Sequence, residues 1–220
     1  MHMKIEPVVF NDLSIEEINQ NYQKYKERIA LYKKHGFDQI KGRENIISTL
    51  GELPETILEV GTGKGHLTSL LAKFCKSKVV TIDLNVDDMK IAALNAAQEG
   101  VLDKIEFFCV NAEDMRLFAD NSFELVVSAF SFHHFEAPFA VMREMMRVTK
   151  DKLFISDFNL YGFSLIEHIH ESEGRKHQEA NSEFDILDVY LGEYGFKVIE
   201  EHDEWQKMYF AKKQNGGNLL

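Results

Sequence analysis

The residues best suited to chemistry begin at Glu59, where a glycine-rich stretch follows a short apolar run. Glycines occupy every second position there, at Gly61, Gly63 and Gly65, and Thr62 separates the first two. Because glycine lacks a Cβ, such a backbone can turn tightly and approach a ligand closely. The residues that follow have the pattern of a helix start, where free N–H groups favour a carboxylate or a phosphate. The stretch therefore predicts a loop that binds a nucleotide-like ligand.

The glycine spacing differs from those of two common nucleotide-binding loops. A dinucleotide-binding loop has its third glycine where His66 stands here, and the Gly-Lys-Ser/Thr run of a P-loop does not occur. An acid ends the next apolar run, since Asp83 comes twenty residues after Gly63. A carboxylate at the end of a parallel strand can accept hydrogen bonds from both hydroxyls of a ribose. The alternative is a helix N-cap, a role for which Asp87 is equally well placed.

The Glu-x-Gly-x-Gly-x-Gly run resembles the first motif of the class I S-adenosylmethionine-dependent methyltransferases. The resemblance implies that this motif holds the methionine end of S-adenosylmethionine and that Asp83 binds the ribose. It further implies that 111–113 meets the adenine and that the product is S-adenosylhomocysteine. The cofactor-binding residues that it implies are Glu59, Gly61, Thr62, Gly63, Gly65, Asp83, Leu84, Asn111, Ala112, Glu113 and Ser128.

Two further segments resemble the same family. Residues 111–115 are similar to its adenine-binding segment, although Asn111 replaces the more common aspartate. An amide oxygen can still accept a hydrogen bond from the adenine amino group, and the alternative is a loop that caps a short helix. Residues 128–135 are similar to the strand and histidine pair that face the acceptor in small-molecule methyltransferases.

The histidine pair supplies the candidate catalytic residues, His133 and His134. A base is needed only if the acceptor must lose a proton, and imidazole is suited to that task near neutral pH. The alternative is that both histidines shape the loop. Asp157, at the end of another apolar run, is expected either to face the cleft or to cap the next helix.

No metal site is expected. His168, His170 and His177 follow on a predicted helix, but their spacing does not suit a metal and favours a solvated face. Only two cysteines occur, Cys75 and Cys109, and both are predicted to be buried thiols in a reducing compartment.

The elements that must position these residues follow a regular order. Strands are expected over 57–60, 78–83, 104–110, 123–129 and 153–157, and helices over 65–75, 86–98, 137–148, 163–177 and 183–194. The strands are nearly continuous apolar runs, as in a parallel sheet covered on both faces. Two last strands, 196–200 and 205–212, have only a short link and must form an antiparallel hairpin. We therefore predict an α/β fold with a doubly wound, mostly parallel seven-stranded sheet.

One domain accounts for the whole chain. Residues 1–52 are predicted to form an N-terminal helical cap, with a capping box at Ser14 and a helix that ends at Gly36. A second cap helix is expected over 38–50. The first helix of the cap carries a stripe of Ile and Tyr side chains, from Ile15 to Tyr32, that either packs on the domain or covers its cleft. Residues 53–213 form the cofactor-binding core, with an insert at 159–194, and 214–220 is expected to be a disordered tail.

The composition limits the kinds of binding partner that are expected for this protein. The formal net charge is −11, which disfavours nucleic acid and favours a small-molecule substrate. No apolar run is long enough to span a bilayer, so the expected location is cytoplasmic without membrane association, as a monomer or homodimer. The predicted function is methyl transfer from S-adenosylmethionine to a small molecule by in-line displacement. A nicotinamide-dependent oxidoreductase and a non-catalytic S-adenosylmethionine-binding module are the alternatives.

Overall fold

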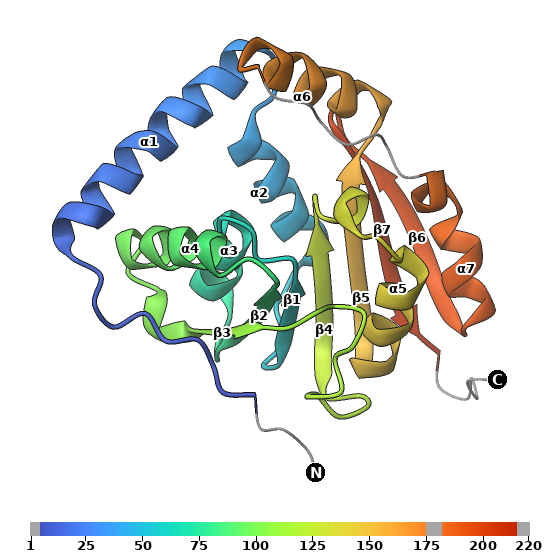
Figure 1. Ribbon diagram of the computed structural model, residues 1–220. Coiled ribbons are helices and arrows are strands. Elements are labelled where there is room, and N and C mark those ends of the chain that lie inside the picture. The colour runs from blue at the N-terminus through green and yellow to red at the C-terminus, as the bar shows by residue number, and fades with distance from the viewer. Residues whose placement is uncertain (1–4, 175–181, 215–220) are drawn as a thin grey trace.

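A seven-stranded sheet forms the centre of the molecule, in the order β3-β2-β1-β4-β5-β7-β6 (Figure 1). The computed structural model describes residues 5–174 and 182–214. The strands are β1 (Ile57–Val60), β2 (Val79–Asp83), β3 (Ile105–Cys109), β4 (Phe123–Ala129), β5 (Thr149–Phe158), β6 (Phe196–His202) and β7 (Gln206–Lys213). Strands β1 to β5 are parallel, and β7 runs antiparallel to both β5 and β6. The predicted fold class is confirmed.

Seven α-helices surround this sheet in the described part of the chain. They are α1 (Ile15–Lys34), α2 (Gln39–Leu50), α3 (His66–Phe74), α4 (Val86–Gln98), α5 (Pro138–Val148), α6 (Leu160–Ser172) and α7 (Leu187–Glu193). Short 3-10 turns are η1 (Leu102–Lys104), η2 (Phe132–His134) and η3 (Ser182–Ile186).

The structure corrects two predicted helices. The helix expected over 163–177 begins earlier, at Leu160, because the Asn159 side chain accepts a hydrogen bond from the Gly162 N–H and caps it. The helix expected over 183–194 is divided into η3 and α7. His177 and the predicted tail beyond Gln214 lie outside the described residues.

Alternate strand residues divide the core between the two faces of the sheet. Ile57 of β1 packs in a cluster with α2, α3 and α4, whereas its neighbour Leu58 packs in a cluster with α5 and α7. Each face buries apolar side chains from several strands, which explains why the strands are apolar throughout. A third, smaller cluster joins the end of α1 to α6 and contains Tyr32, Phe37 and Trp205.

Helix α1 lies outside these layers and crosses above the sheet from α4 toward α6 (Figure 1). The predicted capping box is present, because Ser14 Oγ accepts from the Glu17 N–H and the Glu17 carboxylate accepts from the Ser14 N–H. Only Tyr32 of α1 is fully buried, and the rest of its Ile/Tyr stripe is half-buried or exposed. The stripe therefore covers a cavity more than it fills a core.

The edges of the sheet are finished differently. At β3, Val8 forms an antiparallel bridge with Phe107, and its N–H donates to the Phe107 carbonyl at 2.8 Å. Cys75 is buried as predicted, but Cys109 is exposed, so that prediction was wrong. Cys109 is the last residue of β3, where the helices no longer cover the strand.

Within 5–174 and 182–214, no helix combines the length and apolarity needed to cross a bilayer.

Candidate active site

The loop between β1 and α3 has three glycines with positive φ, and their surroundings differ. A Cβ on Gly61 would lie 2.3 Å from Ser131 Oγ, and one on Gly65 would lie 2.5 Å from the Ala92 Cβ of α4. These two glycines are therefore needed for packing within the protein. A Cβ on Gly63 would meet no atom within 4 Å, although its φ is +47°. Gly63 thus faces open space, the condition expected of a backbone that approaches a ligand.

One cavity, the β2–β3 pocket, has a volume of about 510 Å³ and lies where β2 and β3 end. Its wall includes Asp83, whose Oδ2 accepts from the Gly63 N–H at 2.7 Å and whose Oδ1 accepts from the Asn85 N–H at 3.0 Å. A carboxylate has about four acceptor positions, so two remain for a ligand. The helix N-cap is Asn85, not Asp83 or Asp87, which leaves Asp83 with no capping role.

The segment after β3 forms another wall of the β2–β3 pocket. Leu84, Asn111, Ala112 and Glu113 all line it. The Asn111 Oδ1 accepts from the Glu113 N–H at 2.9 Å and so holds the turn. An amide oxygen has two lone pairs, which leaves one for a ligand amino group. The loop-capping alternative and the ligand-binding role are therefore compatible in this geometry.

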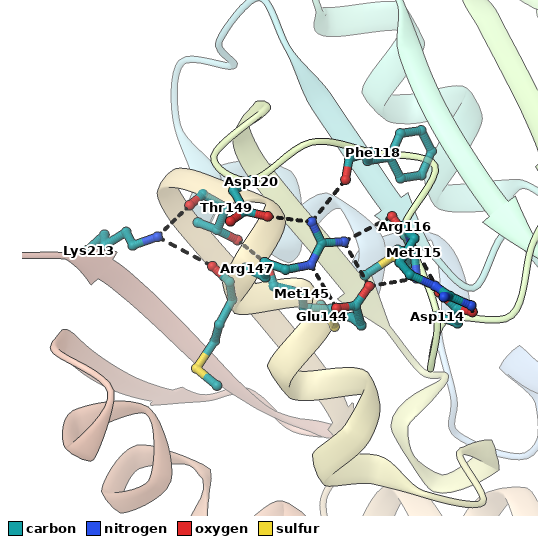
Figure 2. Close-up of polar contacts among 11 residues, drawn as sticks. Asp114, Met115, Arg116, Phe118, Asp120, Glu144, Met145, Arg147, Thr149 and Lys213 are labelled. Atoms are coloured by element: carbon teal, nitrogen blue, oxygen red, sulfur yellow. Dashed lines mark hydrogen bonds and ion pairs between the residues drawn. The ribbon is translucent and has the colours of Figure 1, made fainter. Parts of the chain in front are cut away.

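An arginine clamp fixes the chain that follows this segment (Figure 2). Arg147 of α5 donates to the Phe118 carbonyl at 2.9 Å and to the Met115 carbonyl at 3.0 Å. It also pairs with Glu144 and Asp120, each at 2.7 Å. The Glu144 carboxylate in turn accepts from the Met115 N–H at 2.7 Å. The guanidinium therefore joins both ends of 115–120 to one helix.

The electrostatics of the clamp agree with this geometry. Hydrogen bonding to Arg147 lowers the pKa of Glu144, and hydrogen bonding to Glu144 raises the pKa of Arg147. Lys213 secures the far end of α5, because its Nζ donates to the Thr149 carbonyl at 2.9 Å (Figure 2). The interactions of Arg147 and Lys213 hold α5 in one position. They therefore also hold the wall of the β2–β3 pocket, to which α5 contributes Val141.

A second cavity, the α1 pocket, has a volume of about 410 Å³ and lies beneath α1. Side chains from α1, α2, α6 and the start of α3 line it, including Tyr25, Arg28, Arg43, His66 and His170. It shares five lining residues with the β2–β3 pocket: Gly61, Gly63, Phe130, Ser131 and His134. The two pockets therefore meet at the glycine loop and at the turn after β4.

Glu59 lies at the base of the α1 pocket and is only 2% exposed. Its carboxylate accepts from the hydroxyls of Thr68 and Thr81. Burial raises the pKa of Glu59 to about 7, and the nearby Asp83 adds to this shift. Thr62 supports the arrangement, since its hydroxyl is 2.6 Å from that of Thr81. A carboxyl group in this state gains a proton or loses one according to what binds beside it.

The turn after β4 brings His134 to the junction of the pockets. His134 lines both, whereas His133 is buried behind it, with its ring centroid 3.9 Å away. Asp157 holds His133 by accepting from its backbone N–H at 2.8 Å and by lying 2.8 Å from Nδ1. Phe130 has a φ of +55°, a strained value for a non-glycine residue that is concentrated at functional sites.

Two of the expected residues lie away from both pockets. Ser128 is fully buried within β4, and the adjoining Ala129 reaches the α1 pocket in its place. Asp157 neither lines these two pockets nor caps α6, because Asn159 performs the capping. The capping expectation was therefore wrong. Asp157 lines a third cavity, beside Phe158 and Lys207, and positions the histidine turn.

Several residues of the α1 pocket were missed from the sequence. His170 was expected on a solvated face, yet its Nε2 lies 3.2 Å from the Tyr32 hydroxyl at the pocket wall. Arg43 was not singled out, although it stands three residues before Ile46 and seven before Leu50 on the buried stripe of α2. A charged residue on an apolar stripe is a signal that could have identified it. No group of three metal-binding side chains occurs in the described residues.

The comparisons with known proteins agree with this arrangement. A family model described as a methyltransferase domain matches residues 58–155. The chain is 22% identical to the ubiquinone/menaquinone biosynthesis C-methyltransferase UbiE of Rickettsia prowazekii, over 80% of this chain and 77% of that protein. It is 24% identical to the UbiE protein of Shewanella sp. (strain ANA-3), over 69% of this chain and 62% of that protein.

Solved methyltransferase structures have a similar fold. A putative S-adenosyl-L-methionine-dependent methyltransferase from Methanococcus maripaludis aligns with a TM-score of 0.64 at 19% identity, over 94% of this chain and 99% of that one. The sheet order and the glycine loop define a Rossmann-like nucleoside-binding protein. Together with the methyltransferase-domain match over 58–155, they support a class I S-adenosylmethionine-dependent methyltransferase. The same comparisons support S-adenosylmethionine as the cofactor.

Proposed function

We propose that the enzyme transfers the methyl group to a small-molecule acceptor bound in the α1 pocket. The observation that carries the proposal is the junction of two pockets at the shared residues of the glycine loop and the turn after β4. A nucleoside bound in one pocket and an acceptor in the other would meet at this junction. Both cavities have the size of a small-molecule site, which agrees with the acidic net charge in disfavouring nucleic acid.

The residues fit the cofactor. Gly63 leaves room for it, Asp83 keeps two acceptor positions for the ribose, and 111–113 lines the place proposed for the adenine. Glu59 would receive the methionine ammonium group, because its buried carboxyl gains stability beside a cation. Residues 1–52 are proposed to act as the cap of the same domain and 159–194 as its acceptor-side insert.

S-adenosylmethionine supplies a methyl group on a sulfonium, which is already a good leaving group. The protein mainly aligns the acceptor and excludes water, and orientation of this kind can contribute about 7–11 kcal/mol. Where the acceptor carries a proton, His134 is proposed to accept it at the pocket junction. Asp157 is acceptor-only, so His133 Nδ1 would donate to it and stay fixed behind His134.

Calorimetric titration with S-adenosylhomocysteine and with NAD tests the cofactor assignment. We expect binding of S-adenosylhomocysteine and none of NAD, and preferential NAD binding would contradict the proposal. The family match already disfavours the oxidoreductase alternative. Transfer of a radiolabelled methyl group to a panel of small metabolites separates turnover from a non-catalytic binding module. We further propose a reducing, cytoplasmic location, since both thiols are free.

A further inference from the structure

The charges of the α1 pocket are opposite to those of the chain. The protein has a net charge of −11, yet Lys24, Arg28, Arg43 and Lys64 line this cavity with a single acid, Glu59. The β2–β3 pocket is lined by four acids, and none of its described lining residues is Lys or Arg. A cluster of cations in an acidic protein indicates that the cavity receives negative charge.

Arg43 is the cation of this pocket that is partly buried and that no carboxylate contacts directly within the described residues. Arg28 pairs with Glu173 at 2.9 Å, and Lys24 and Lys64 are exposed to solvent. Arg43 is half-buried, forms no ion pair within the described residues, and donates to the Gln39 carbonyl at 2.9 Å. A guanidinium has five N–H donors, so most of its hydrogen-bonding capacity is available to a ligand. Desolvation lowers the pKa of Arg43, and the nearby Tyr25, Tyr32 and Glu59 offset only part of this shift.

The cofactor brings no net negative charge to the α1 pocket. S-adenosylmethionine carries a sulfonium, an ammonium and one carboxylate, so its arrival adds net positive charge beside the glycine loop. Net negative charge to match the cations of the α1 pocket must therefore come from the acceptor. Arginine suits a carboxylate better than other anchors do, because its planar fork forms two parallel hydrogen bonds.

The walls beside Arg43 indicate a flat acceptor. The Tyr25 and His66 rings are in contact at a tilt of 30°, with centroids 4.7 Å apart, and the Arg43 guanidinium lies 5.6 Å from the centre of the Phe130 ring. Phe130 is shared with the β2–β3 pocket, so a ring placed against it lies near the junction. Such surfaces pack well against aromatic rings.

We propose that the acceptor is a small aromatic carboxylate and that Arg43 of the α1 pocket binds its carboxylate group. This inference rests on the proposed methyltransferase function and names the substrate class of the same site. Arg43 would set specificity, while the methyl-accepting atom would lie on the ring side, toward Phe130 and His134.

Matched ligand pairs test the inference in the intact protein saturated with S-adenosylhomocysteine. Benzoate, 4-hydroxybenzoate and salicylate are each titrated by calorimetry beside the corresponding carboxamide. We expect the carboxylates to bind about tenfold or more tightly than the amides. Carboxamides that bind equally well, or carboxylates that fail to bind, would overturn the inference.

The variant R43Q should lose about tenfold or more in carboxylate affinity, and R43K should recover part of that loss. The control K24Q removes the same charge from an exposed position of α1 and should change affinity about twofold at most. Thermal unfolding of each variant checks that the fold is intact. An equal loss in K24Q and R43Q would mean that general charge, and not Arg43, attracts the carboxylate.

Cofactor binding separates this inference from the proposed function. Wild type and R43Q are titrated with S-adenosylhomocysteine and with 5′-methylthioadenosine, which lacks the amino-acid group. We expect R43Q to bind both as wild type does. If R43Q weakens only S-adenosylhomocysteine, Arg43 binds the carboxylate of the cofactor and the inference fails while the proposed function stands. If wild type binds neither nucleoside, the proposed function itself fails.

Discussion

The two pockets differ both in charge and in how the chain builds them. The β2–β3 pocket is made by strand ends and the loops that follow them, and its charged residues are all acids. The α1 pocket is made by α1, α2, α6 and the start of α3, which are far apart in sequence, and its charged residues are mostly cations. One glycine loop serves both sites. The comparison teaches that the motif residues describe the cofactor side, whereas the acceptor side depends on tertiary packing.

Asp83→Ala should produce the largest effect and act on the β2–β3 pocket. We expect affinity for S-adenosylhomocysteine to fall about 100-fold, because two hydrogen bonds to a charged group are lost. Calorimetry measures this affinity. Asp87→Ala is the matched control, since it removes the same charge from the first turn of α4. An Asp83→Ala protein that binds as wild type does would remove the ribose assignment.

Gly63→Ala tests whether the open space at the loop belongs to the ligand. The left-handed backbone costs an alanine about 1 kcal/mol, and its Cβ would occupy the ligand's space, so affinity should fall more than about tenfold. Gly100→Ala carries similar strain at φ +70°, but Gly100 lines neither the α1 pocket nor the β2–β3 pocket, so this variant should lose stability but not affinity. Equal affinities in the two variants would show that Gly63 serves only the turn.

Glu59 should make cofactor binding depend on pH. Because its pKa in the folded protein is raised to about 7, the stability contributed by its protonated form is complete below about pH 4.5 and is lost as pH rises through 7. A cationic ammonium group favours the ionised carboxylate, so binding should release a proton. We expect affinity for S-adenosylhomocysteine to increase about tenfold from pH 6 to pH 8.

Titrations in buffers of different ionisation enthalpy measure the released proton. Glu59→Gln should abolish the release and flatten the pH profile, whereas Glu55→Gln, at an exposed site before β1, should leave both unchanged. An unchanged profile in Glu59→Gln would assign the titration to another group.

Arg147→Lys should have the smallest effect and separate the two pockets. Lysine keeps the charge but cannot join Phe118, Met115 and Glu144 at once, so stability should fall by about 1–2 kcal/mol. Affinity for the nucleoside should fall about threefold because the wall at 111–113 loosens, a loss of about 0.6 kcal/mol. Carboxylate binding in the α1 pocket should not change. Denaturant unfolding and calorimetry test these expectations, and an equal loss in both pockets would contradict the division.

Local patterns were sufficient for most of the fold. Apolar runs located every strand, and the short link before β7 predicted the antiparallel hairpin correctly. The start of α6 was less accurate, because the Asn159 side chain decides it. The bounds of α4 were predicted correctly, but its N-cap is Asn85 and not Asp83 or Asp87. Such caps depend on one or two local hydrogen bonds, for which several neighbouring residues are equally suited.

The residues of the candidate site also fall into a group that the sequence could predict and a group that it could not. Gly63, Asp83 and 111–113 follow strands in order, so topology alone brings them to one rim. Tyr32 and His170 meet only because α1 and α6 pack together, and no local spacing encodes that contact. Arg43 reaches the same pocket from α2. The exposure of Cys109 likewise depends on where the helices stop covering β3.

The bridge between Val8 and β3 has a practical consequence for handling this protein. An uncovered outer strand offers unpaired N–H and C=O groups to other chains and promotes aggregation. Strand β6, at the opposite border, protects itself with charged side chains such as Lys197, Glu200 and Glu201. Strand β3 instead depends on the segment around Val8. Removing the residues that precede α1 would therefore leave the edge of β3 unpaired and reduce solubility, even though every residue that lines the two pockets would remain.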